Sequence, residues 1–233
     1  MTHPHRAHRI LLALLALLVL STAGFGFYVG DYYRAEPAAL AVLDEPGLSI
    51  DGDTTILSPA SASDTGILFY PGAKVEAEAY LPLLDQLRDQ GFTCFLIHMP
   101  ANMAIFDADA ALDVIAAHPE ISHWYLAGHS MGGAMASSCA ADNPAAFDGL
   151  ILLGAYLYGD YPPADTLTIY GSLNESVAEK IDYTDNVLVI DGGNHAQFGN
   201  YGPQKGDPAA AISASDQQTQ SVQAITDFIH SRG

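Results

Sequence analysis

The sequence predicts an α/β fold in which helices cover both faces of a mostly parallel sheet, and three observations lead to this prediction. Several short segments are apolar throughout, as strands buried on both faces are. Segments with the helical spacing of apolar residues separate them, and this alternation is typical of a parallel sheet. Apolar residues make up 49% of the 233 positions, which suits one packed domain with a small appendage.

The first elements of the main domain are a hairpin, a strand and a helix. "LSIDGDTTILS" predicts a hairpin, because the pair Asp51-Gly52 tolerates the positive φ of a tight turn. "TGILFYPG" predicts a buried strand that ends at a Pro-Gly break. The helix after it has Pro82 near its first turn and ends at Gly91.

The following segments continue the alternation. A second helix is predicted from four apolar residues that share one face: Ile105, Ala108, Leu112 and Ile115. A final helix opens with the capping spacing of Ser215 and Gln218. The other predicted strands are "FTCFLIHMP", "HWYLAG", "FDGLILLGAY", "TLTIYGS" and "NVLVIDGG".

The amino end differs from the rest of the chain. Residues 1–9 are basic, and residues 10–30 carry no charge over the length of about 20 residues that a helix needs to cross a bilayer. We predict a cytoplasmic tail at 1–9, a transmembrane anchor at 10–30, a linker at 31–47 and a folded domain at 48–233. Because the positive charges precede the anchor, the folded domain is expected outside the cytoplasm.

The alternative for the same segment is a secretory signal peptide. Ser21 and Ala23 would then be the small residues before the cleavage site. The apolar stretch continues through Phe25 to Val29, which is longer than a signal core needs, so we favour the anchor. Both interpretations put the folded domain outside the cytoplasmic membrane.

The excess of acidic residues excludes some kinds of partner. With 27 acidic and 8 basic residues, the formal net charge is −19, which argues against nucleic acids and anionic lipids as partners of the domain.

Cys94 and Cys139 lie within apolar segments, so we predict buried thiols, with a disulfide as the less favoured alternative. No phosphate loop, zinc-ligand spacing or dinucleotide fingerprint occurs, and we expect no cofactor and no metal.

The sequence "YLAGHSMGGAMAS" carries a candidate nucleophile. Ser130 stands between Gly128 and Gly132, after a predicted strand and before a small-residue helix. Flanking glycines allow a sharp strand-to-helix turn and leave the serine hydroxyl uncovered, as in a nucleophile elbow. A serine that only caps the helix is the alternative.

These motifs resemble those of the α/β-hydrolase superfamily, and more narrowly its compact "alpha/beta hydrolase family 5" group related to dienelactone hydrolases. The resemblance covers about residues 50–232 and rests on "FYPGAKVEAEAY", "HMPANMAIFD", "HWYLAGHSMGGAMA", "LLGAY" and "GGNHAQFGNYGPQKGD". It implies an α/β-hydrolase fold and a Ser, acid, His triad in that chain order. It also implies hydrolysis of esters or of related acyl and C–C bonds, without naming the substrate.

His195 is the candidate general base, because it lies in a glycine-rich loop after the last predicted strand, where such families carry this residue. Two backbone N–H groups are expected to form the oxyanion hole. These are the amide of Met131, just after the nucleophile, and that of Ala73, just after "ILFYPG". Lys74, beside Ala73, is a candidate to bind a substrate carboxylate, or it is simply solvated.

The triad acid is the point at which this sequence departs from the family pattern. Relatives resemble Gly-Ser-x-Asp-Gly after the corresponding strand, whereas this chain has "GSLNE" with Asn174 in the place of the aspartate. We predict Glu175 as the acid, because it is the nearest carboxylate along the chain. The alternatives are Asn174 itself and three further carboxylates, Asp160, Asp185 and Asp191.

The function predicted from these residues is that of a membrane-anchored, extracytoplasmic serine hydrolase, most simply a carboxylesterase. The connection "LYGDYPPADT" is too short for a cap domain, so we expect an open site, bounded by Tyr70, Tyr156 and Tyr158, that takes small or accessible esters. The alternative, from a different class, is a non-catalytic binding module that has lost activity with the change at position 174.

Overall fold

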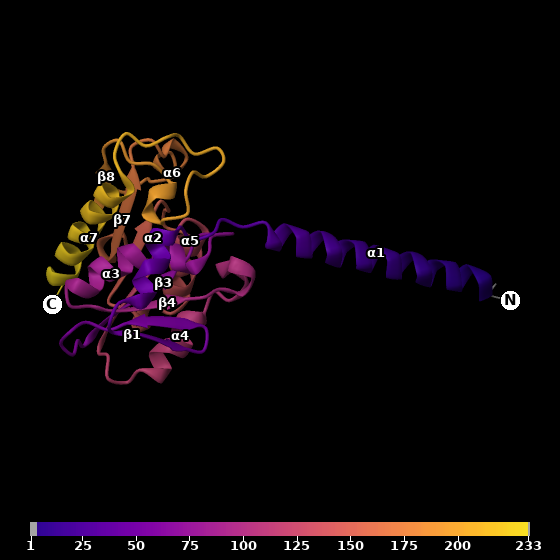
Figure 1. Cartoon of the computed structure of the whole chain (residues 1–233), viewed down its shortest axis with the longest axis horizontal. Helices are drawn as coiled ribbons and strands as arrows, with labels where there is room; N and C mark the ends of the chain where they lie inside the picture. Colours follow the sequence, from indigo (N-terminus) through magenta and orange to yellow (C-terminus); the bar gives the residue numbers. More distant parts are fainter. Residues whose placement is uncertain (1–3, 233) are drawn as a thin grey trace. The chain divides into compact units, whose positions relative to one another are not determined.

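The computed structural model describes residues 4–232, and these divide into an amino-terminal unit and a main body (Figure 1). The amino-terminal unit consists of helix α1 (Pro4–Gly30). Its segment His8–Gly30 has a mean hydropathy of 2.4 and is long and apolar enough to cross a membrane. The helix includes most of the predicted tail, of which residues 1–3 lie outside the described residues.

The main body contains one eight-stranded sheet in the order β1-β2-β4-β3-β5-β6-β7-β8. Strands β3 to β8 run parallel to one another, and β2 is antiparallel to both of its neighbours, β1 and β4. This confirms the predicted mostly parallel sheet. The strands are β1 (Leu48–Asp51), β2 (Thr54–Leu57), β3 (Thr65–Tyr70), β4 (Thr93–Ile97), β5 (His123–His129), β6 (Gly149–Leu153), β7 (Thr166–Gly171) and β8 (Val187–Ile190).

Helices cover both faces of the sheet because successive strand residues point to opposite sides. In β3, Ile67 and Phe69 join the core under one set of helices, and Leu68 and Tyr70 join the core under the other. The first set consists of α2 (Pro37–Leu40), α3 (Leu81–Asp89) and α7 (Ala214–His230), and Figure 1 shows α7 alongside β7 and β8. The second set consists of α4 (Ala110–Ala117) and α5 (Met131–Asp142).

The structure differs from the prediction at two helix starts. Helix α4 begins at Ala110, because residues 100–106 form two short 3₁₀ turns instead, and Ile105 is consequently exposed. Helix α7 is capped by Ser213 rather than Ser215: the Ser213 hydroxyl accepts a hydrogen bond from the amide of Asp216. Both cysteines are buried free thiols, as predicted.

Residues expected as a linker form part of the main body. Tyr33 makes a β-bridge with Val75, and the Glu36 amide donates to the carbonyl of Asn200. Ala39, in α2, is fully buried in the core. The folded body therefore begins near residue 33, and these contacts support the loops after β3 and β8.

The strand order determines where a site can form. The chain passes from β3 to β4 on one side and then crosses to β5 on the other side of β3. At such a reversal the loops after the two central strands diverge and leave a crevice at their carboxyl ends. The loops after β3 and β5 carry the predicted oxyanion residue Ala73 and the predicted nucleophile Ser130.

Candidate active site

Ser130 occupies a strained turn between β5 and α5. Its backbone has φ 54° and ψ −122°, a conformation that costs a non-glycine residue free energy and is concentrated at functional sites. A Cβ at Gly128 would lie 2.6 Å from Gly132 backbone atoms, and one at Gly132 would lie 2.2 Å from the carbonyl oxygen of Tyr70. Glycine is therefore required at both positions, and the turn has the geometry of a nucleophile elbow.

His195 comes from the loop after β8 and faces the serine. Its Nε2 lies 3.0 Å from Ser130 Oγ, which is a hydrogen-bonding distance for proton transfer. The backbone of the histidine loop is held by Asp207, whose two carboxylate oxygens accept hydrogen bonds from the amides of His195 (3.1 Å) and Ala196 (2.8 Å).

The third member of the group is Asn174, which lies in the turn after β7. Asn174 Nδ2 lies 2.8 Å from His195 Nδ1, and the side chain is buried, with 5% of its surface exposed. The other end of its carboxamide is 3.0 Å from Ser176 Oγ. A hydroxyl both donates and accepts, so this geometry fits either orientation of the carboxamide, and with Oδ1 toward the ring it accepts the Nδ1 proton.

Asn174 therefore occupies the position that was expected for Glu175, and the expectation that Glu175 contacts His195 is wrong. Glu175 begins the short helix α6 (Glu175–Ala178) and is exposed on the wall of the cavity. The turn after β7 directs position 174 inward and position 175 outward. Among the three candidate aspartates, Asp191 lies near Ser172 (3.5 Å), and neither Asp160 nor Asp185 contacts His195 within the described residues.

The loop after β3 lies beside the elbow. A Cβ at Gly72 would lie 2.8 Å from the His129 ring, which shows how closely the two loops approach. Neither the amide of Ala73 nor that of Met131 donates to another group among the described residues, so both are available as oxyanion donors. Lys74 adopts φ 57° and does not line the cavity in front of Ser130.

A buried imidazole, His129, joins these loops. The carbonyl oxygen of His195 only accepts, so His129 Nε2, at 2.9 Å, carries the proton and donates it. His129 Nδ1 then accepts from the Tyr80 hydroxyl at 2.7 Å, and this hydroxyl accepts from the Gly72 amide at 3.1 Å. Burial holds the pKa of His129 well below its usual range, which keeps the ring neutral, as this pattern requires.

Two opposing effects act on the charge state of His195. Burial lowers its pKa, because a charged ring is poorly solvated there, and the Asp207 carboxylate acts in the opposite direction. The net shift is downward. At neutral pH the ring is therefore unprotonated and able to accept a proton from Ser130.

An open cavity of about 800 Å³ lies in front of Ser130, Asn174 and His195. Tyr156 lines it as predicted, whereas Tyr70 is buried and donates to the carbonyl of Ala108. Its other lining residues include Met131, Leu173, Val177, Lys180, Lys205 and Asp207. In the part of the chain that the structure describes, no group of three or more His, Cys, Asp or Glu residues is placed to hold a metal ion.

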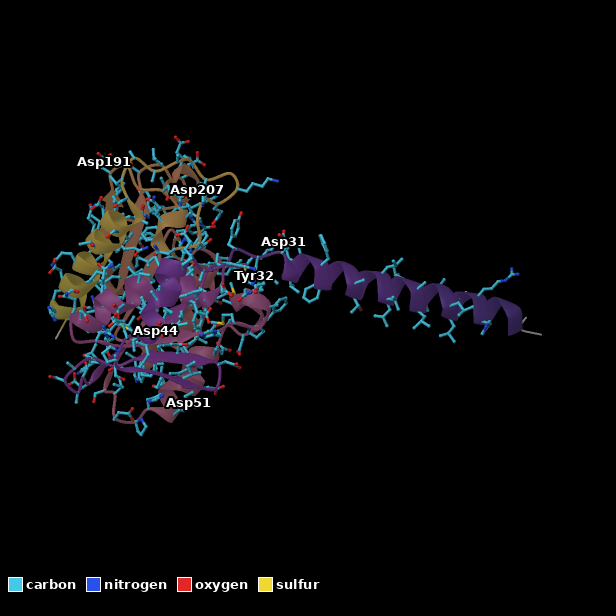
Figure 2. The ribbon with its side chains drawn as sticks, viewed as in Figure 1. Asp31, Tyr32, Asp44, Asp51, Asp191 and Asp207 are labelled. Carbon is cyan, nitrogen blue, oxygen red and sulfur yellow. The ribbon has the colours of Figure 1, made fainter. Side chains whose placement is uncertain are left out.

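The sequence analysis did not identify three residues of this site: Tyr80, Ser176 and Asp207. Asp207 closes the segment "GGNHAQFGNYGPQKGD", and its position in that segment was the available signal. Figure 2 shows Asp207 at the end of the body where Figure 1 labels α6, and residues of α6 line the same cavity. Neither Tyr80 nor Ser176 has a comparable signal in the sequence. Tyr80 contacts His129, which is distant in sequence. Ser176 contacts Asn174 within an irregular turn.

The sequence profile of the Alpha/beta hydrolase family matches residues 66–219. This range includes Ser130, Asn174, His195 and Asp207 and most of the chain. The chain therefore belongs to the alpha/beta hydrolase family. No curated protein sequence matches it.

Solved structures of several hydrolases share its fold. A dienelactone hydrolase from Anabaena variabilis is 18% identical, with 76% of this chain and 90% of that chain covered and a TM-score of 0.51. Est1E from Butyrivibrio proteoclasticus is 17% identical, with coverages of 79% and 99% and a TM-score of 0.55. A thermostable carboxyl esterase from Bacillus coagulans is 12% identical, with coverages of 76% and 93% and a TM-score of 0.52.

The electrostatics of the site predict how its histidines titrate. We expect His195 to titrate below the usual value of about 6.5, because burial outweighs the effect of Asp207. His129 is expected to remain neutral well below that pH. Imidazole NMR resonances recorded against pH measure both, with His195→Gln and His129→Gln used for assignment. A His195 that titrates above about 7 would contradict this description.

Proposed function

We propose that this protein is a serine hydrolase that cleaves carboxylic esters through an acyl-enzyme. The observation that supports this most strongly is the 3.0 Å contact between Ser130 Oγ and His195 Nε2 at a strained elbow. A serine hydroxyl becomes a competent nucleophile when an imidazole at this distance accepts its proton. Membership of the alpha/beta hydrolase family supports the same chemistry.

The proposed reaction uses these groups in two stages. Ser130 Oγ attacks the ester carbonyl carbon while its proton moves to His195 Nε2, and the carbonyl π electrons move to the oxygen. The amides of Met131 and Ala73 donate to this oxyanion. The tetrahedral intermediate then expels the alcohol, which takes the proton from Nε2. Water attacks the acyl-enzyme with the same proton transfers and releases the carboxylic acid and free Ser130.

Asn174 orients His195 in this mechanism. Nε2 accepts the serine proton only if Nδ1 holds the other ring proton, and the Asn174 carboxamide, 2.8 Å from Nδ1, selects that tautomer when its oxygen faces the ring. The carboxamide does not neutralise the imidazolium, because it carries no charge. Glu175 lies on the cavity wall, where its side chain faces substrate or solvent.

The substrates that we infer are small or surface-presented esters. The cavity is open, and the chain between β6 and β7 has no length for a cap that would enclose a long acyl chain. The similar structures include proteins described as a dienelactone hydrolase and a carboxyl esterase, and these descriptions fit a substrate with an accessible ester bond. A role for Lys74 in binding a substrate carboxylate remains a prediction.

Removal of either the nucleophile or the base tests this proposal. We expect Ser130→Ala and His195→Ala each to lower kcat for a short-chain ester by about 10⁴-fold or more, with the double variant little worse, because the two act as one unit. Rates on p-nitrophenyl acetate, with thermal unfolding as a control for folding, measure this. Hydrolysis that survives in either variant would contradict these residue assignments, and its absence from the folded wild type would favour a non-catalytic binding module.

The residue next to His195 Nδ1 can be identified by two matched substitutions. We expect Asn174→Ala to lower kcat by about 10- to 100-fold, because the ring loses its orientation. Asn174 makes no side-chain cap to α6, so this variant keeps the helix. Glu175→Gln is expected to stay within about threefold of wild type. The reverse pattern in ester-hydrolysis assays would restore Glu175 as the triad acid.

We also propose that α1 anchors the protein in the cytoplasmic membrane with the body outside the cytoplasm. The apolar segment His8–Gly30 and the basic residues before it support this orientation. We expect the full chain to stay with membranes after carbonate washing and its intact mass to include Met1 or Thr2. A chain lacking residues 1–30 keeps Tyr33 and its bridge to Val75, and it is expected to be soluble and active. Recovery of a soluble chain that starts near Gly24 would instead indicate a cleaved signal peptide.

A further inference from the structure

The site lacks a charge where a serine hydrolase triad usually has one. When His195 accepts the serine proton it becomes an imidazolium, and Asn174 next to Nδ1 is neutral. The ring behind it, His129, is also neutral, because burial holds its pKa well below the usual range. A buried cation without a nearby anion is costly, so the negative charge must come from another residue.

Four charged side chains line the cavity around His195: Glu175, Lys180, Lys205 and Asp207. The two lysines repel an imidazolium, and Glu175 is exposed, where water screens its charge. Asp207 differs, because both of its oxygens are fixed on the histidine loop by the amides of His195 and Ala196. Of these four groups, only Asp207 raises the pKa of His195 through its charge.

We propose that Asp207 is the charged partner of His195, so that the task of one triad acid is divided between two residues. Asn174 orients the ring through Nδ1, and Asp207 supplies the negative charge through space from the backbone side. The hydrogen bonds of Asp207 go to the backbone of the histidine loop and not to the ring, and it is therefore a positioning residue. This inference rests on the proposed hydrolase function.

The arrangement has a physical basis in the two hydrogen bonds to Asp207. Donation by two consecutive amides keeps the carboxylate beside the loop through the catalytic cycle. The ring is largely buried, so the field of a nearby fixed charge is screened less than it would be in water. The imidazolium is thereby stabilised without a direct ion pair.

The test compares Asp207→Asn with and without Asn174→Asp. Asp207→Asn alone is expected to lower kcat about tenfold or more with KM little changed, because one pKa unit corresponds to a tenfold change in imidazolium stability. The acidic limb of the pH–rate profile is expected to move to lower pH by about one unit, since loss of the negative charge lowers the pKa of His195. Asn174→Asp adds a carboxylate at Nδ1, and in the double variant it is expected to restore kcat and move the limb back.

Three outcomes decide between explanations. A wild-type rate in Asp207→Asn would overturn the proposal. A low rate that Asn174→Asp does not restore would also overturn it, because Asp207 would then act only by holding the loop. Absence of hydrolysis in wild type would instead overturn the proposed function itself. Asp191→Asn serves as the matched control, because the Asp191 carboxylate contacts Ser172 and accepts from neither the His195 nor the Ala196 amide, and its rate is expected to be unchanged. If Asp207→Asn does not fold, Asp207→Ser, a second neutral variant, enters the same comparison.

Discussion

The candidate site depends on the buried ring of His129, which holds three separate loops together. It extends from the elbow, donates to the carbonyl of His195 and accepts from Tyr80, whose hydroxyl in turn accepts from the Gly72 amide. The His195 carbonyl can only accept and the Gly72 amide can only donate, so the tautomer of His129 is fixed. The loops after β3, β5 and β8 are thereby held together, and the proposed nucleophile, base and oxyanion donors are positioned before any substrate binds.

The second feature of the site is the separation of orientation from charge. Asn174 directs the ring of His195, and Asp207 holds the histidine loop by its backbone. A carboxylate in place of the Asn174 carboxamide would both orient the ring and supply the negative charge. It would also stabilise the imidazolium, and His195 would then become protonated at a higher pH. Together with burial, which lowers the pKa of His195, a neutral partner keeps the base unprotonated toward lower pH. This suits a chain whose body is proposed to lie outside the cytoplasm.

The sequence was sufficient for those parts of the fold that follow from local patterns. Apolar runs predict the buried strands and their mostly parallel arrangement. Glycines that allow close approach predict the turn at Ser130. The choice between Asn174 and Glu175 did not follow, because neighbouring residues in an irregular turn point in different directions. Nor did Asp207 or Tyr80, because each acts through contacts between distant segments. Likewise, the segment from residue 33 resembled a linker, since its packing partners lie far away in sequence.

In the proposed mechanism, His195 activates Ser130 as a nucleophile at a preorganised site. The most direct measurement is covalent labelling of the full chain with a fluorophosphonate, followed by peptide mass spectrometry to locate the adduct. We expect one phosphonylated residue, Ser130, at a rate that falls as His195 becomes protonated. A folded protein that takes no label, or that carries the label on another residue, would contradict it.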